Sequence, residues 1–143
     1  MQNVSVEQRL RRFLLAVVAS IFAGTTFELV LLNHTEELLQ WVPFAVSAVG
    51  LAAIAAVWFA PRKGTLLTLR WSMILTIVAS FVGMYIHFSR NFSFIREINP
   101  SFTYIDAIWP AMKGSYPLLA PGILLLAGVL GLAAVWKHPK LRS

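Results

Sequence analysis

The chain has 143 residues, of which 58% are hydrophobic and only 13% are charged. A soluble domain carries about 25% charged residues, and a small globule has too little interior to bury so many apolar side chains. The chain has no cysteine, which excludes disulfides, thiolate catalysis and iron–sulfur clusters. The net charge of +6 comes from basic residues beside apolar stretches, a pattern that favours a membrane protein over a nucleic-acid-binding protein.

Four apolar stretches predict membrane-spanning helices, because a bilayer core about 30 Å thick needs about 20 helical residues. The predicted spans are residues 13–32, 41–60, 69–88 and 117–136. The first span follows three arginines and could also be read as a signal peptide, but its apolar run continues past any small-residue cleavage site. We therefore expect an all-α integral membrane protein with four transmembrane helices in one domain.

Small residues and prolines refine two of these spans. Ala48, Ala52 and Ala56 recur every four residues, a stripe that would let another helix approach closely. In the last span, Pro121 either kinks the helix or precedes its true first turn. Gly128 contributes to a small face suited to helix packing.

A long, partly helical outer loop is expected between the third and fourth spans, over residues 89–116. Its aromatic and aliphatic content argues against disorder. Thr103 and Asp106 form a capping-box pattern, which predicts a short interfacial helix at residues 103–113, although Pro110 falls inside it. Asn91 to Ile98 alternates weakly and is expected to be extended.

Basic residues predict the orientation of the chain. Nine of the 12 lysines and arginines lie before the first span, around the second link or after the last span, three in each place. The positive-inside rule then places both termini in the cytoplasm. Tryptophans are common at membrane interfaces, which predicts lipid-interface anchors at Trp41, Trp58, Trp109 and Trp136.

Glu28 is the most unusual residue, because it lies inside the first predicted span. A carboxylate at membrane depth is costly, so it is expected to face other helices or a water-filled pocket. Gly24 and Thr25 lie on the same side of the helix. Two interpretations stay open: a proton, cation or substrate site, or a carboxylate paired within the bundle.

Further ionisable groups gather on the predicted outer side. Together with Glu28, the candidate ligand or ion site comprises His34, His87, Asn91 and Glu97. Imidazole and carboxylate ligands suit zinc or iron, so a metal ion bound by His34, His87 and Glu28 is one hypothesis. A second, less favoured hypothesis is a haem held between His34 and His87. The alternative to a metal ion or a haem is that these side chains simply form hydrogen bonds.

Polar residues form a stripe along the third span. Ser72, Thr76, Ser80 and His87 recur at steps of four and seven, which keeps them on one helical face. Such a stripe could line a polar path, but hydrogen bonding to a neighbouring helix or to the backbone is the favoured interpretation.

The wording of three stretches resembles a group of small, uncharacterised bacterial four-span membrane proteins. The resemblance rests on FELVLLNHTEELLQWVPF, on HFSRNFSFIREINP and on PLLAPGILLLAGVLGLAAVWKHP. It implies a four-span architecture in a bacterial inner membrane and no particular activity.

The sequence contains no phosphate-binding loop and no nucleophile elbow, which favours a non-catalytic protein over an enzyme. The leading hypothesis is an accessory subunit with an outward polar site for a partner, a small molecule or a metal ion. The first alternative is an oligomeric channel or transporter subunit that uses Glu28. The second is a membrane-embedded enzyme that depends on a metal or haem. Expected partners are the lipid bilayer and other membrane proteins or further copies of the chain, and no nucleic acid.

Overall fold

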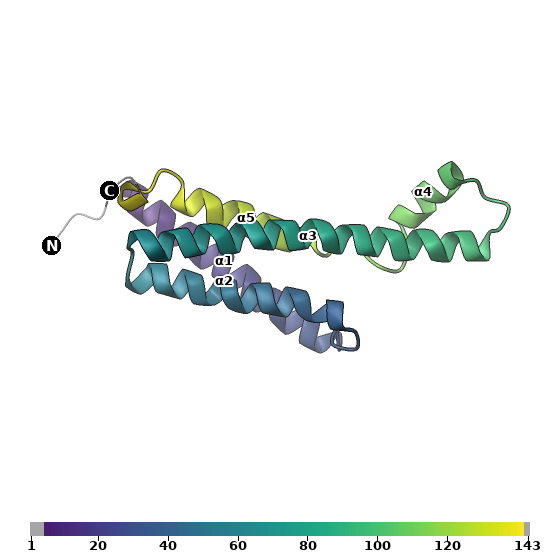
Figure 1. Ribbon diagram of the computed structural model, residues 1–143, viewed down its shortest axis with the longest axis horizontal. Coiled ribbons are helices and arrows are strands. Elements are labelled where there is room, and N and C mark those ends of the chain that lie inside the picture. Colours follow the sequence, from purple (N-terminus) through teal and green to yellow (C-terminus); the bar gives the residue numbers. More distant parts are fainter. Residues whose placement is uncertain (1–4, 142–143) are drawn as a thin grey trace.

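The computed structural model describes residues 5–141, and all regular secondary structure in that range is helical (Figure 1). The elements are α1 Val6–Leu31, η1 Leu38–Trp41, α2 Val42–Phe59, α3 Lys63–Ile98, α4 Tyr104–Met112, α5 Gly122–Val135 and η2 Pro139–Leu141, where η marks a 3₁₀ helix. The all-helical class predicted from the sequence is confirmed.

Three helical stretches are long and apolar enough to cross a bilayer. They are Val6–Leu31, Leu38–Phe59, which joins η1 to α2, and Lys63–Ile98. α1 begins at a capping box, in which the side chains of Ser5 and Gln8 each accept a hydrogen bond from the backbone N–H of the other residue. Three spans of sufficient length and hydropathy therefore follow from the described chain.

The fourth apolar stretch differs from its prediction. α5 has 14 residues, about 21 Å at 1.5 Å per residue, which is shorter than a bilayer core. The span expected at residues 117–136 began too early, because Pro117 and Pro121 bracket a run of turns. Pro121 precedes the first helical residue instead of kinking the helix. The structure does not support a count of four membrane-spanning helices.

α3 is longer than expected. The hydropathy pattern predicts that this helix ends near residue 88, and the weak alternation of Asn91 to Ile98 predicts extended backbone, but α3 continues for 36 residues, about 54 Å. No glycine or proline interrupts residues 84–99, so the helix ends only at Asn99, next to Pro100. The first part of the expected outer loop is thus a continuation of the helix.

α1, α2, α3 and α5 pack side by side as a bundle, and α3 continues past it (Figure 1). α5 and α2 each lie against both α1 and α3. The buried core includes Phe22 of α1 and Met73 of α3. α5 approaches α3 through Gly128, where an added Cβ would lie 2.9 Å from the Met73 carbonyl oxygen. The backbones of α3 and α5 are therefore in close contact.

The alanine stripe of α2 does not serve this packing. Ala48 and Ala52 are exposed and Ala56 is half-buried. α2 instead approaches α1 through Gly50, where an added Cβ would lie 2.4 Å from the Phe22 ring. The stripe remains on the outer surface of the bundle.

The end of α3, α4 and their links form the outer arm, residues 89–116. α4 occupies the region of the expected helix at 103–113, and Thr103 caps it by accepting a hydrogen bond from the Asp106 amide. Ala107 and Ala111 are fully buried where α4 packs on α3. The guanidinium of Arg96 lies 4.0 Å from the centre of the Tyr104 ring. α4 is thus fixed to the end of α3.

Candidate functional site

The segment that leads from α4 back to α5 is bound by polar side chains of α3. This strap, residues 114–121, has no continuous helical hydrogen-bond ladder, so its carbonyl groups need other donors. Ser80 donates its hydroxyl to the Pro121 oxygen at 2.6 Å. The Nδ1 atom of His87 lies 2.8 Å from the Pro117 oxygen, a contact that requires a proton on Nδ1.

Asn91 completes this attachment from the next turns of α3. Its side chain is only 1% exposed. The side-chain nitrogen of Asn91 donates a hydrogen bond to the backbone carbonyl oxygen of Tyr116 at 2.7 Å, and the side-chain oxygen of Asn91 accepts one from the backbone N–H of Tyr116 at 3.0 Å. Gly114 makes room for it, because an added Cβ would lie 2.2 Å from the Asn91 side chain. Asn91 therefore pairs with the strap as a neighbouring backbone would.

An ion pair ties the first link of the chain to the same region. Glu37, just before η1, pairs with Arg90 of α3, and the Arg90 guanidinium lies 5.6 Å from the Tyr116 ring centre. Burial lowers the pKa of His34, and the positive charges of His87 and Arg90 lower it further, against the opposing effect of Glu37. The neutral form of His34 is thereby favoured at neutral pH.

The five residues proposed for a ligand site do not form one group. His87 and Asn91 are joined through the strap, and His34 lies close enough to sense the charge of His87. Glu97 lies ten residues after His87 on the same helix, about 15 Å further along its axis. Glu28 is exposed on α1, and within residues 5–141 no hydrogen bond or ion pair reaches its carboxylate. The geometry therefore separates Glu28 and Glu97 from the strap contacts.

Metal-ligating side chains are also dispersed. Among the described residues, no three His, Cys, Asp or Glu side chains lie together in a way that could hold a metal ion. His34, His87 and Glu28 do not make such a group. The carboxylate that opposes the lowering of the His34 pKa is Glu37, which is already paired with Arg90.

The polar stripe of α3 is turned toward the protein. Ser72 and Thr76 are buried, and each donates its hydroxyl to a backbone oxygen of its own helix, at 2.8 and 2.9 Å. Ser80 continues the row by binding the strap. This arrangement agrees with packing and backbone hydrogen bonding as the role of the stripe.

The outer arm carries an exposed apolar surface. Ile105 and Trp109 of α4 are 79% and 63% exposed. Further exposed aromatic and aliphatic side chains on the arm are Phe94, Ile98, Tyr104, Ile108, Met112 and Tyr116. Lys113 lies over Trp109, with its Nζ atom 4.5 Å from the ring centre. Clusters of exposed aromatic and aliphatic side chains on a fixed element mark interaction sites.

Sequence reasoning missed the residue that holds the other end of α5. Arg11 of α1 donates to the carbonyl oxygens of Ala134 and Trp136, at 2.6 and 2.8 Å, and also pairs with Glu7. These carbonyls are left open because α5 ends at Val135. No sequence signal marks them, since backbone oxygens accept hydrogen bonds whatever the residue type.

The predicted interface tryptophans are all exposed, at both ends of the bundle and on the outer arm. They are Trp41, Trp58, Trp109 and Trp136. Comparison of the chain with protein-family models, with curated proteins and with solved structures found no match.

Proposed function

We propose that the chain is a multi-pass integral protein of a bacterial inner membrane, with both ends in the cytoplasm and the outer arm outside. Three helices long and apolar enough to span support this, as does the distribution of basic residues. α5 is short, so the fourth crossing would be completed by the strap. Non-helical backbone is tolerated at membrane depth where protein groups satisfy it, as Ser80 and His87 satisfy the strap.

In this membrane, the protein acts as a non-catalytic accessory subunit that binds a partner protein through the outer arm. The observation that carries this proposal is the length of α3. Its length of about 54 Å is much greater than the thickness of a bilayer core, about 30 Å. The far end of α3 therefore holds α4 beyond the bundle. A rigid arm of this kind presents its surface at little entropic cost on binding.

The surface chemistry of the arm favours a protein partner over a small ligand. Exposed aromatic side chains such as Tyr104 and Trp109 are typical anchors of protein interfaces. Two polar side chains of the predicted ligand site, His87 and Asn91, form hydrogen bonds with the strap instead. These two side chains hold the strap against α3, and the exposed surface of α4 is the part that would contact the partner.

One observation favours a second candidate, an oligomeric ion or proton channel subunit that uses Glu28. This carboxylate is exposed on α1, and no other residue between positions 5 and 141 forms a hydrogen bond or ion pair with it. Gly24, one turn earlier, has open space around it, so a second copy of the chain has room to approach there. No comparable observation favours an enzyme.

The membrane orientation can be tested directly, because the natural chain has no cysteine. Single cysteines at Ser101→Cys and Lys137→Cys would be treated with a membrane-impermeant maleimide. We expect the first to react in cells with a permeabilised outer membrane, and the second only after the inner membrane is opened. Labelling of both or of neither before opening would contradict the proposed orientation.

The partner can be tested with a photo-crosslinking amino acid placed at Ile105 or Trp109. We expect both positions to capture one and the same protein in cells. A matched control at Phe59, also strongly exposed but at the opposite end of the bundle, should not capture it. Capture of lipid alone at residues 105 and 109 would mean that α4 lies on the membrane surface and would overturn the docking proposal.

A further inference from the structure

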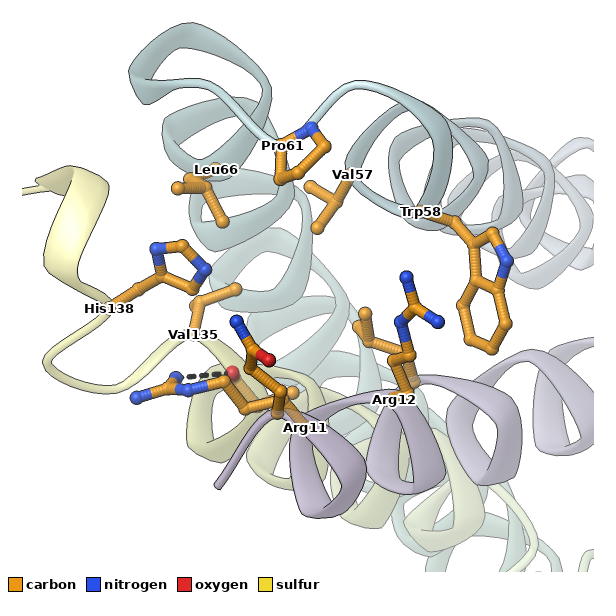
Figure 2. A pocket seen from close by; sticks show the side chains of 11 residues that line it. Arg11, Arg12, Val57, Trp58, Pro61, Leu66, Val135 and His138 are labelled. Atoms are coloured by element: carbon orange, nitrogen blue, oxygen red, sulfur yellow. Dashed lines mark hydrogen bonds between the residues drawn. The ribbon is translucent and has the colours of Figure 1, made fainter. Parts of the chain in front are cut away.

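A cavity at the basic end of the bundle has no role in the proposed partner binding. Its volume is about 290 Å³, and it lies where α1 and α3 begin and where α2 and α5 end. This volume is near the lower end of the range of about 300–1,000 Å³ for small-molecule sites, which suits a headgroup better than a whole lipid. Side chains of Arg11, Arg12, Trp58 and His138 line it (Figure 2).

The two arginines of the cavity have different roles. Arg11 is engaged with Glu7 and with the carbonyls at the end of α5. Arg12 lies 5.7 Å from the centre of the Trp58 ring, and among residues 5–141 no carboxylate forms an ion pair with it. Arg12 is therefore a positioned guanidinium whose charge is not neutralised by a neighbour.

The surroundings of the cavity are strongly positive. Of the six acidic residues in the chain, only Glu7 lies at this end, and Arg11 occupies it. Figure 2 shows the His138 ring and the Arg12 guanidinium on different sides of the cavity. Burial lowers the pKa of His138, and the charges of Arg11 and Lys140 add to this effect against the weaker influence of Glu7. A bound anion would relieve this repulsion.

We infer that this cavity binds a phosphate group, supplied by the headgroup of an anionic phospholipid in the inner leaflet. A guanidinium matches phosphate oxygens in geometry and charge, and Trp58 provides an apolar wall at the depth of the headgroups. Basic pockets between helices at the cytoplasmic surface attract anionic lipids. The inference depends on the proposed orientation of the membrane protein and is independent of the partner at the outer arm.

The test uses the full-length protein, delipidated in a neutral detergent, with bound lipid counted by native mass spectrometry. When the two lipids are added back, we expect the wild type to bind one phosphatidylglycerol with at least tenfold preference over phosphatidylcholine. Arg12→Gln combined with His138→Gln should remove this preference. Arg9→Gln is the matched control, because it removes one positive charge from the same exposed stretch of α1 but does not line the cavity.

Each outcome decides a part of the inference. Equal retention of phosphatidylglycerol in the wild type and in the double variant, or an equal loss in Arg9→Gln, would overturn the site in favour of general surface attraction. Displacement of the lipid by millimolar inorganic phosphate would support a site that binds the phosphate group alone. Retention of the lipid under that challenge would support a site for the lipid itself. Cysteine labelling reports a wrong orientation separately, since binding by the purified protein does not depend on it.

Discussion

The two ends of α5 are held by the same means but in different surroundings. Before its first turn, donors on α3 bind the carbonyls of the strap; after its last turn, Arg11 of α1 binds two open carbonyls. At the outer end the donors include the Ser80 hydroxyl and the Asn91 side-chain amide, which carry no charge, and Asn91 is almost completely buried. At the inner end the donor is charged and a cavity remains beside it. The outer end is thus filled for stability, and the inner end retains room for an anion.

This comparison predicts that the outer attachment contributes most to stability. Asn91→Ala removes both hydrogen bonds to Tyr116 and leaves its amide and carbonyl without their partners. We expect a loss of roughly 2–4 kcal/mol in the free energy of unfolding, because two hydrogen bonds of about 0.5–1.5 kcal/mol each are lost and truncation of the buried Asn91 side chain leaves a cavity. Denaturant titration in detergent would measure it. Asn99→Ala is the control, since Asn99 bonds only the Ile95 oxygen of its own helix and should lose far less.

The attachment of α5 by Arg11 is expected to make the second-largest contribution to stability. Arg11→Gln loses the charged hydrogen bonds to Ala134 and Trp136, which contribute about 1.5–3 kcal/mol when a charged group is involved. Hydrogen exchange should then show faster opening of the last turn of α5, with the strap unaffected. Faster exchange in the strap as well would mean that the two ends of α5 are not independent, and would contradict the comparison.

Between its two ends, α5 is held by close packing against α3. Gly128→Ala would place a Cβ 2.5 Å from Ile77 and 2.9 Å from the Met73 oxygen, so we expect a loss of about 1–3 kcal/mol from overpacking. Gly24→Ala is the matched control, because nothing lies within 4 Å of its added Cβ and alanine is the better helix former. Thermal unfolding of both variants should shift in opposite directions; equal shifts would contradict the close contact.

The fold was predictable where length and hydropathy decide it. The helices at α1, α2 and α3 follow from apolar runs long enough to span, and the capping box at Thr103 marks α4. The length of α3 is not predicted, because the apolar run ends near residue 88 and an outer loop is expected from residue 89, although no glycine or proline ends the helix there. The two prolines of the strap explain the short α5.

The candidate site was harder to predict for a physical reason. His87 and Asn91 are predicted as candidates because polar residues near a membrane need partners, but their partners are backbone groups that no sequence pattern encodes. The ion pair of Arg90 with Glu37 differs from the strap contacts, because it joins two charged side chains that both lie on the predicted outer side. Topology together with charge would have suggested that pair, whereas the strap contacts required the three-dimensional path of the chain.

The smallest expected effect distinguishes the two ends by pH. Burial is the largest cause of the lowered pKa of both His34 and His138, and nearby positive charges add to it. The folded protein therefore binds these protons less readily than the unfolded chain, so stability is full above the unfolded pKa of about 6.5 and falls as the pH drops toward the lower folded pKa. The pKa of Asp106 is also lowered, but from 3.8, so it does not titrate in this window.

Unfolding midpoints at pH 7.5 and pH 5 would measure this loss. We expect His34→Gln and His138→Gln each to remove part of it. Phosphatidylglycerol should restore stability at pH 5 through His138 alone, because only the inner histidine lines the cavity where the phosphate would bind. An equal rescue in wild type and His138→Gln would mean that the lipid acts elsewhere. In that case the two ends would differ in charge but not in their response to an anion.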